Sequence, residues 1–325
     1  MKILLTHTPQ MRRDYYGTRS LKGLQALGDV LLHEGDEALD AAALVAAAKD
    51  ADIIVADRKT EGPSEIFGKL PKLRAFVRCA VDIRNIDVEA ATKQGILVTQ
   101  AGPGFQKSVS EMAIGYMIDL SRHISRATAD YQAGKMPDVV MGRQLSGSTA
   151  GIMGYGSIGS HLAPILKAMG MTVLVADPYA KVQDPDIKHV SLEQLLAKSD
   201  YVVCLVVATE ETENLMNAAA FARMQPSAVF INLSRGNLVD EAALLAALKG
   251  NTIAGAALDV GREPDQMPSR IIAKLPNVIA TPHTGALTPP SIEYQSLETV
   301  QQVAKIIKGE APVGAVNASA WTRNR

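Results

Sequence analysis

Short apolar segments alternate with helical patterns along most of the chain. In the first hundred residues they predict strands at residues 3–6, 30–32, 53–56, 75–79 and 96–99, with helices at 21–26, 41–49 and 88–92. A second series predicts strands at residues 150–153, 172–176, 201–206, 228–232, 253–258 and 278–280. The later strands are continuous apolar runs, which is typical of parallel strands covered on both faces. We therefore predict an α/β protein with two doubly wound parallel-sheet domains.

A long helical pattern separates the two series. The apolar positions Val109, Met112, Ala113, Tyr116 and Leu120 recur at spacings of three and four residues, which marks one face of a helix. A polar stretch without regular periodicity follows from residue 132 to residue 148. This part of the chain is therefore predicted to be a helix followed by an irregular arm.

Composition narrows the class of protein. A chain of 325 residues with 47% hydrophobic and 21% charged residues is typical of about two globular domains. The net charge is −1 and no basic patch is evident, which argues against a nucleic-acid partner. The apolar run at 201–208 is far shorter than the roughly 20 residues that span a bilayer, so no membrane role is expected.

The cysteines and histidines do not predict a metal site. Cys79 and Cys204 lie in separate apolar runs and are too isolated for a disulfide framework or a thiolate site, so a reducing, cytoplasmic setting is expected. No pair of histidines has metal-ligand spacing, and we expect no metal. His7, at the end of the first predicted strand, could face a ligand. The histidines interpreted as packing or surface residues are His33, His123, His161 and His189.

A glycine-rich segment follows the first strand of the second series. It reads Gly154-Tyr155-Gly156-Ser157-Ile158-Gly159 and leads into a predicted helix. Glycines in such a loop permit a tight turn, close approach of the backbone to a pyrophosphate, and close packing of helix against strand. The helix N-terminus presents free N–H groups to the phosphates. A glycine-rich surface turn is the alternative, but the strand before and the helix after favour dinucleotide binding.

An acid at the end of the next strand indicates which dinucleotide. Asp177 directly follows the predicted strand 172–176. A carboxylate there can accept hydrogen bonds from the adenosine ribose hydroxyls and would repel a 2′-phosphate, so the sequence favours NAD over NADP. The alternative is that Asp177 is a solvated strand end or a helix cap.

Three chemically distinct side chains follow later strands of the second series. Arg235, Glu263 and His283 each come shortly after the end of a predicted strand, where ligands bind in open α/β sheets. Hydride transfer at a carbonyl carbon needs a cation to orient the substrate, a proton donor, and a neighbour that sets the pKa of that donor. These residues form a candidate catalytic set. A surface ion pair for Arg235 and a solvated loop acid for Glu263 are the alternatives.

Several motifs resemble those of the D-isomer-specific 2-hydroxyacid dehydrogenase family. The most specific is the segment 224–240; the others are 257–264, 281–285, 85–87, 95–98 and 108–111. The resemblance covers essentially the whole chain and is looser before residue 70. It implies a Rossmann-type NAD domain at 101–289, inserted into a flavodoxin-like substrate domain made of 1–100 and 290–325. The substrate would lie in the cleft between them.

The resemblance also implies roles for individual residues. Arg235 would bind the substrate carboxylate and carbonyl through its planar guanidinium. His283 would be the acid/base, and Glu263 would accept the hydrogen of its second ring nitrogen and stabilise the imidazolium. Asp259 would join Asp177 and the glycine loop in binding NAD. The helix and arm at 105–147 would pack against a second subunit in a homodimer, with an ordinary intrachain helix as the alternative.

The sequence departs from the family at one turn. Relatives usually carry Gly-x-Gly where this chain has Ala80-Val81-Asp82, and the N–H groups of that turn help bind the substrate carboxylate. If Asp82 points toward the substrate, its charge would favour a cationic or hydroxylated substrate arm; if it points outward, only the stiffness of the loop changes. Arg58 and Lys59 sit where relatives build the other wall of the pocket, so Arg58, Val81 and Asp82 are candidate substrate-binding residues.

The leading hypothesis is an NAD-dependent enzyme that interconverts a 2-keto acid and a D-2-hydroxy acid. A second hypothesis is a dehydrogenase of an atypical substrate, such as phosphoglycerate, formate or phosphite. A third is an NAD-sensing binding protein that resembles the corepressors of this fold. The sequence shows no disordered extension of the kind that such corepressors use for partners, which argues against the third.

Overall fold

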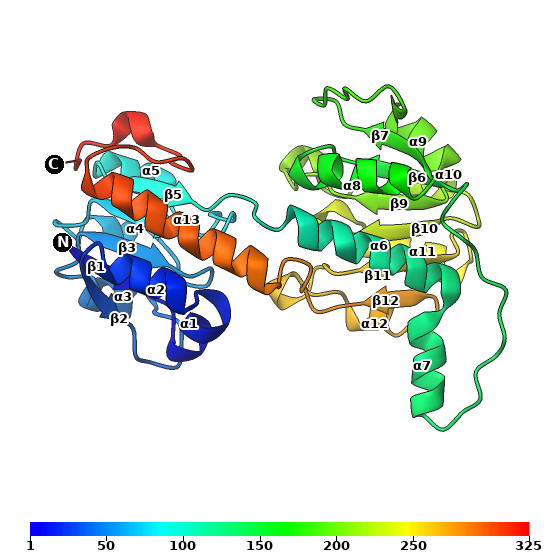
Figure 1. Ribbon diagram of the computed structural model, residues 1–325, viewed down its shortest axis with the longest axis horizontal. Coiled ribbons are helices and arrows are strands. Elements are labelled where there is room, and N and C mark those ends of the chain that lie inside the picture. The colour runs from blue at the N-terminus through cyan, green and yellow to red at the C-terminus, as the bar shows by residue number, and fades with distance from the viewer. Residues whose placement is uncertain (325) are drawn as a thin grey trace. The chain divides into compact units, whose positions relative to one another are not determined.

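The computed structural model describes residues 1–324 and divides into two compact units (Figure 1). Unit 1 comprises Met1–Gly104 and Thr288–Arg325, and unit 2 comprises Phe105–Leu287. The sequence analysis drew the corresponding boundaries after residues 100 and 289. Each unit has its own parallel sheet and its own hydrophobic clusters.

Unit 1 contains a five-stranded parallel sheet in the order β2-β1-β3-β4-β5. The strands are β1 (Lys2–Leu5), β2 (Asp29–Leu32), β3 (Ile53–Ala56), β4 (Ala75–Arg78) and β5 (Leu97–Gln100). The helices are α1 (Pro9–Tyr15), α2 (Thr18–Gln25), α3 (Ala41–Ala47), α4 (Ser64–Phe67), α5 (Val88–Lys93) and α13 (Pro289–Ile307). This strand order is the flavodoxin-like one, which confirms the predicted fold of this half.

The long helix α13 was not predicted from the sequence. It begins with two prolines, which suit the first helical turn because the N–H groups there have no partner within the helix. Its buried face is largely polar, and this hides the apolar periodicity on which helix prediction depends. The buried polar side chains pair across unit 1: Ser296 with Ser20, Thr299 with Tyr16, and Gln302 with Thr99.

Hydrogen bonds hold the C-terminal tail against the sheet of unit 1. Asn317 accepts a hydrogen bond from the Val98 N–H at 2.8 Å and donates to the Ile96 carbonyl oxygen at 2.9 Å. Trp321, the only tryptophan of the chain, is 7% exposed, and its Nε1 donates to the Arg74 carbonyl oxygen at 3.0 Å. Trp321 is therefore a core residue of unit 1.

Unit 2 contains a seven-stranded parallel sheet in the order β12-β11-β10-β9-β6-β7-β8. The strands are β6 (Thr149–Met153), β7 (Thr172–Ala176), β8 (Ile187–His189), β9 (Tyr201–Cys204), β10 (Val229–Asn232), β11 (Gly255–Leu258) and β12 (Val278–Ala280). The strand order reverses between β6 and β9, which is where ligands bind in doubly wound sheets. Sequence analysis missed β8, a short edge strand with two exposed residues.

Helices cover both faces of this sheet and bury its apolar strands. They are α6 (Gln106–Arg122), α8 (Ser157–Ala168), α9 (Leu192–Lys198), α10 (Ala218–Arg223), α11 (Glu241–Lys249) and α12 (Arg270–Ala273). The apolar face of α6 was predicted correctly, since Val109, Ala113 and Tyr116 are all buried. The two-sided cover explains why the strands read as continuous apolar runs.

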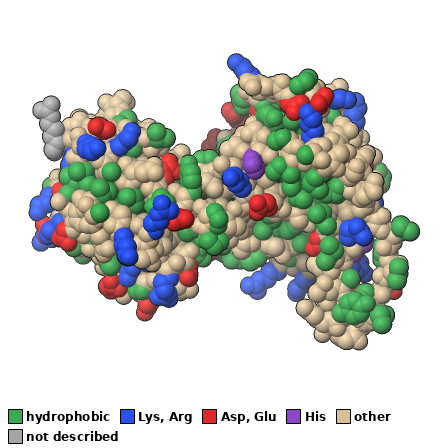
Figure 2. All heavy atoms as spheres, in the orientation of Figure 1, with side chains coloured by type: hydrophobic (Ala, Val, Ile, Leu, Met, Phe, Trp, Pro, Cys, Tyr) green, Lys and Arg blue, Asp and Glu red, His purple; other side chains and the backbone are tan. Residues whose placement is uncertain are grey.

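Helix α7 (Ile124–Gln132) and the irregular segment after it project from the body of unit 2 (Figure 1). We call residues 124–144 the arm. Helix α6 ends at His123, whose left-handed backbone (φ 55°) turns the chain into α7, a helix that the sequence analysis did not predict. Hydrophobic side chains gather on the arm (Figure 2). The most exposed are Tyr131, Met136, Val139 and Met141.

No helix within residues 1–324 is long and apolar enough to cross a membrane. In the same part of the chain, no group of three or more His, Cys, Asp or Glu side chains is arranged to hold a metal ion.

Candidate active site

The glycine loop connects β6 to α8, and each glycine occupies a different environment. Gly154 has a φ of +90°, and a Cβ there would lie 2.8 Å from the Leu205 backbone. A Cβ on Gly159 would lie 2.3 Å from the Gly154 carbonyl oxygen. Gly156 instead faces open space. Two glycines are thus required by the backbone itself, and the third leaves room for a bound group.

The N-terminus of α8 can bind an anion. Helix α8 begins at Ser157 without a side-chain cap, and no hydrogen bond within residues 1–324 involves the N–H groups of Gly156, Ser157 or Ile158. Uncapped N–H groups at the positive end of a helix fit a pyrophosphate. The donors predicted for the dinucleotide are therefore together and available.

Asp177 lies beside this loop at the end of β7, as the sequence predicted. Its carboxylate accepts hydrogen bonds from the Tyr155 N–H at 2.7 Å and from the Tyr179 N–H at 2.8 Å. The residue is half-buried, and the two carboxylate oxygens have lone pairs left for ribose hydroxyls. Asp177 therefore holds the turn of the loop and keeps further acceptor capacity.

The three candidate catalytic residues follow three adjacent strands. β12, β11 and β10 are neighbours in the sheet, and their last residues pair directly: Ala280 with Leu258, and Leu258 with Asn232. Because parallel strands end at the same edge, the segments carrying Arg235, Glu263 and His283 leave the sheet side by side.

Arg235 is half-buried in a short loop after β10. Asn232 closes this loop: its side-chain oxygen accepts from the Ser234 N–H at 3.1 Å, and its side-chain nitrogen donates to the Arg235 carbonyl oxygen at 3.0 Å. A Cβ on Gly236 would lie 2.1 Å from the Gly261 backbone. Glycine at 236 therefore lets the loop of Arg235 pack directly against the segment that leads to Glu263.

Glu263 is exposed and begins a short turn after β11. Its N–H donates to the Met267 carbonyl oxygen at 3.1 Å, and the Gly261 N–H donates to the Gln266 carbonyl oxygen at 2.8 Å. Inside the turn, Asp265 and Gln266 have φ angles of 58° and 61°. This left-handed pair turns the Asp265 carbonyl oxygen toward His283.

His283 is half-buried and has a left-handed backbone, with φ of 56°. Its ring Nδ1 lies 2.8 Å from the Asp265 carbonyl oxygen. Because a carbonyl can only accept, Nδ1 carries a hydrogen in this contact. The predicted acceptor for this nitrogen was the Glu263 carboxylate. The nitrogen faces the Asp265 carbonyl instead, and the Glu263 pairing stays a prediction.

Asp259 holds the loop that carries His283. It is buried at the end of β11, and its Oδ1 accepts from the Thr284 N–H at 2.8 Å and the Thr281 hydroxyl at 2.5 Å. Its Oδ2 accepts from the Gly285 N–H at 2.8 Å. Sequence reasoning placed Asp259 only among the NAD-binding residues and missed this role. An acid at a strand end opposite a Thr-x-x-Thr-Gly segment is the signal that could have found it.

Three of the predicted substrate-binding residues, Arg58, Val81 and Asp82, lie in unit 1. Asp82 closes its own turn: it accepts from the Arg84 backbone N–H at 3.1 Å and from the Arg84 guanidinium at 2.6 to 3.2 Å. Val81 is half-buried beside it. Arg58 is exposed after β3, and its carbonyl oxygen accepts from the Asn85 side chain at 3.2 Å. The structure thus gives Asp82 a partner within its own loop.

A buried polar cluster beneath these loops was not foreseen. Arg78, at the end of β4, is fully buried; its guanidinium donates to the carbonyl oxygens of Asp57 and Thr60 and, at 2.8 Å, to the Asn85 side-chain oxygen. The Asp57 carboxylate accepts from the Thr6 hydroxyl at 2.7 Å. Arg78 therefore ties the loop of Arg58 to the loop of Asp82.

His7 belongs to the same cluster and is 2% exposed. Its ring packs against Tyr16 at a centroid distance of 4.9 Å, and its Nδ1 has no hydrogen-bond partner among the described residues. Burial lowers the pKa of His7 to about 4, although the nearby Asp57 carboxylate opposes that shift. His7 is thus neutral at neutral pH.

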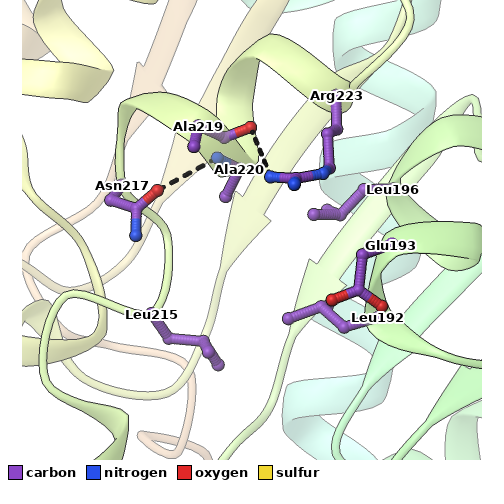
Figure 3. Close-up of a pocket in the computed structure, with 8 residues that line it drawn as sticks. All are labelled: Leu192, Glu193, Leu196, Leu215, Asn217, Ala219, Ala220 and Arg223. Atoms are coloured by element: carbon purple, nitrogen blue, oxygen red, sulfur yellow. Dashed lines mark hydrogen bonds between the residues drawn. The ribbon is translucent and has the colours of Figure 1, made fainter.

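A surface cavity of about 180 Å³ lies between α9 and α10 (Figure 3). Arg223 and Glu193 contribute to its wall, and Arg223 donates to the Ala219 carbonyl oxygen at 3.2 Å. Asn217 caps α10 through the Ala220 N–H at 3.1 Å. None of the predicted site residues lines this cavity.

The chain is similar to known dehydrogenases and reductases. Residues 114–285 match the pattern of the D-isomer specific 2-hydroxyacid dehydrogenase, NAD binding domain. The chain is 33% identical over 303 residues to a D-3-phosphoglycerate dehydrogenase of Methanocaldococcus jannaschii, covering 92% of this chain and 57% of that protein. It is 32% identical over 259 residues to a hydroxypyruvate reductase of Thermotoga maritima, covering 79% of this chain and 85% of that protein.

Solved structures are similar over nearly the whole chain. A D-2-hydroxyisocaproate dehydrogenase has a TM-score of 0.86 at 27% identity, covering 98% of this chain and 100% of that one. A D-lactate dehydrogenase with NAD+ from Lactobacillus jensenii has a TM-score of 0.84 at 26% identity, covering 97% and 99%. By contrast, the chain spans about half the length of several phosphoglycerate dehydrogenases that it matches, 57% and 55% for two of them.

The burial of His7 predicts an acid-sensitive unit 1. The folded pKa of about 4 lies below the ordinary value of 6.5, so the unfolded chain binds more protons between these pH values. The free energy of unfolding should therefore fall by up to about 3 kcal/mol as the pH drops through this window. Denaturant titrations followed by Trp321 fluorescence measure it, and His7→Gln should flatten the slope. An equal slope in the variant would contradict this assignment.

Proposed function

Because this chain belongs to the D-isomer-specific 2-hydroxyacid dehydrogenase family, we propose that it interconverts a 2-keto acid and a D-2-hydroxy acid by hydride transfer with NAD. The observation that carries the proposal is the adjacency of three strand ends. β10, β11 and β12 lead at one edge into Arg235, Glu263 and His283. A cation, a carboxylate and an imidazole at one sheet edge meet the needs of this reaction.

NAD fits the residues of unit 2. When bound, NADH supplies the hydride that reduces C2 of the substrate. The free N–H groups of Gly156, Ser157 and Ile158 would hold the pyrophosphate at the start of α8. Asp177 would accept from the ribose hydroxyls through the lone pairs that its two backbone donors leave over.

The substrate is oriented and protonated by this chain's own side chains. Arg235 binds the carboxylate of the keto acid and polarises the carbonyl through its planar set of donors. As the hydride reaches C2, Nε2 of His283 donates a proton to the carbonyl oxygen, and in the oxidation direction it takes that proton back. The hydrogen bond of Nδ1 to Asp265 fixes the ring for this exchange.

Glu263 adds a charge that favours the protonated ring. A carboxylate near an imidazolium stabilises it and raises the pKa of the histidine. In this proposal the exposed Glu263 side chain reaches His283 when substrate is bound. Until then, the Asp265 carbonyl oxygen keeps the same ring nitrogen protonated.

In this proposal, Val81, Asp82 and Arg58 determine which substrate the enzyme accepts. The Arg84 guanidinium neutralises the Asp82 carboxylate within the loop, so Asp82 repels an anionic substrate less than a free carboxylate would. The exposed Arg58 adds a cation. These two features favour a second candidate, an acid with an additional anionic group such as 3-phosphoglycerate, the substrate in the names of several relatives.

The protein is proposed to act as a homodimer in the cytoplasm. The arm exposes Val139 and Met141 almost completely, and apolar patches of this kind are typical of subunit interfaces. Both cysteines are free, as in reducing compartments.

His283→Ala should lower turnover by about 10²- to 10⁴-fold and leave NADH affinity unchanged, because only the proton transfer is lost. NADH absorbance measures turnover with pyruvate, hydroxypyruvate and, in reverse, 3-phosphoglycerate. Fluorescence titration measures NADH binding, and His33→Ala serves as the control.

Wild-type reduction should also slow at alkaline pH as the imidazolium is lost. Turnover of His283→Ala at the wild-type rate, or a wild type inert toward every acid tested, would refute the proposal.

The double variant Val139→Ser/Met141→Ser should shift the protein from dimer to monomer, because both apolar side chains would leave the subunit interface. Sedimentation velocity at micromolar concentration reports the change. Val313→Ser, which alters another exposed apolar residue, this one in unit 1, is the control. A wild type that sediments as a monomer would contradict the interface.

A further inference from the structure

We propose that Tyr116 on α6 is a positioning residue for His283 and acts through Thr281 and Asp259. The inference rests on the proposed function, in which His283 is the acid/base. The hydroxyl of Tyr116 contacts Thr281. It holds the strand end from which the His283 loop begins.

The hydrogen-bond chain has one direction. The Tyr116 hydroxyl contacts Thr281 Oγ1, and Thr281 Oγ1 contacts Asp259 Oδ1 at 2.5 Å. A carboxylate accepts, so the one hydroxyl proton of Thr281 goes to Asp259. Tyr116 must therefore donate its own proton to Thr281. Burial raises the pKa of Tyr116, so this donor keeps its proton throughout the working pH range.

Packing explains the ring of Tyr116 but not its hydroxyl. The side chain is 5% exposed and lies in the apolar core between α6 and the sheet. Phenylalanine would fill the same space and avoid burying a polar group, which is costly unless the group is hydrogen-bonded. The position of the hydroxyl, at the end of β12, is what suggests a role in the site.

The loop after β12 is held by hydrogen bonds to the Asp259 side chain as well as by the bond from the Thr281 N–H to the Leu258 carbonyl oxygen of β11 at 3.0 Å. β12 is a three-residue edge strand that pairs only with β11, and no residue in it is fully buried. Thr281 is the first residue after it, and its carbonyl oxygen accepts from the His283 N–H at 3.0 Å. A shift of Thr281 therefore moves the backbone of His283 directly.

Losing the Tyr116 hydroxyl should loosen this loop without breaking the fold. Thr281 would keep its bond to Asp259 and lose its second partner, at about the strength of one hydrogen bond. We expect kcat to fall about tenfold, the equivalent of one such bond, and KM for NADH to stay unchanged. Small displacements of a catalytic group are known to cost rate in this way.

The test compares Tyr116→Phe with Tyr201→Phe. Tyr201 is a buried tyrosine of the same core, and its hydroxyl lies 2.6 Å from Ser121 Oγ, also on α6, so both variants lose one buried hydrogen bond to or from this helix. The readouts are kcat for 2-keto acid reduction across pH, KM for NADH, and the melting temperature. Tyr116→Phe should lower kcat at every pH, whereas Tyr201→Phe should change only the melting temperature.

Thr281 provides a second, independent set of variants. Thr281→Ser keeps the hydroxyl and should retain kcat, while Thr281→Val should lower it. The double variant Tyr116→Phe/Thr281→Val should be no slower than Thr281→Val alone, because both changes break the same chain. This comparison stays informative if Tyr116→Phe folds poorly.

The outcomes separate the two proposals. Wild-type kcat in Tyr116→Phe, or equal kcat losses in Tyr116→Phe and Tyr201→Phe, would overturn the positioning role. So would additive losses in the double variant. If His283→Ala retains turnover, the proposed function fails regardless of the result at Tyr116.

Discussion

The buried carboxylate of Asp259, at the end of β11, accepts hydrogen bonds from Thr281, Thr284 and Gly285. Taking a carboxylate out of water is costly unless several donors surround it. The loop after β12 supplies these donors, and it can do so only when its backbone folds closely around Asp259. A Cβ on Gly285 would come within 2.9 Å of the carboxylate, so the fit requires glycine there. The conformation of His283 follows from this constraint.

Unit 1 contains a similar arrangement, in which the buried charged group is a cation instead of a carboxylate. There a buried cation, Arg78, sits at the end of β4 and donates to carbonyl oxygens of the loop after β3 and to Asn85 of the loop after β4. In each unit, a charged residue at the end of a central strand fixes the loops that surround it. Residues that would meet ligands, such as Asp82 and His283, are carried by those loops.

The features that could be predicted from the sequence are those that depend on residues close together in the chain. Continuous apolar runs identified nearly all the strands, and the glycine loop predicted an NAD site because strand, turn and helix are contiguous there. Helix α13 was missed because its buried face carries Ser296, Thr299 and Gln302, whose partners lie far away in the sequence. β8 was missed because an exposed edge strand has little apolar signal.

The candidate site likewise has residues that could be predicted from the sequence and contacts that could not. Arg235, Glu263 and His283 could be identified because each follows a strand and belongs to a family motif. The supporting contacts could not, since Tyr116, Asp259 and Thr281 come together only through the packing of α6 on the sheet. The Asp265 carbonyl oxygen faces His283 because Asp265 and Gln266 have left-handed backbone angles. The sequence Asp-Gln does not by itself predict such angles.

We propose that unit 2 carries a hydride-transfer site specific for D-2-hydroxy acids. It is tested most directly by supplying NADH in which both hydrogens at C4 of the nicotinamide are deuterium, together with hydroxypyruvate or pyruvate. The account predicts a D-2-hydroxy acid with one deuterium at C2, seen by mass spectrometry and chiral chromatography. A product without deuterium, or one of L configuration, would contradict it.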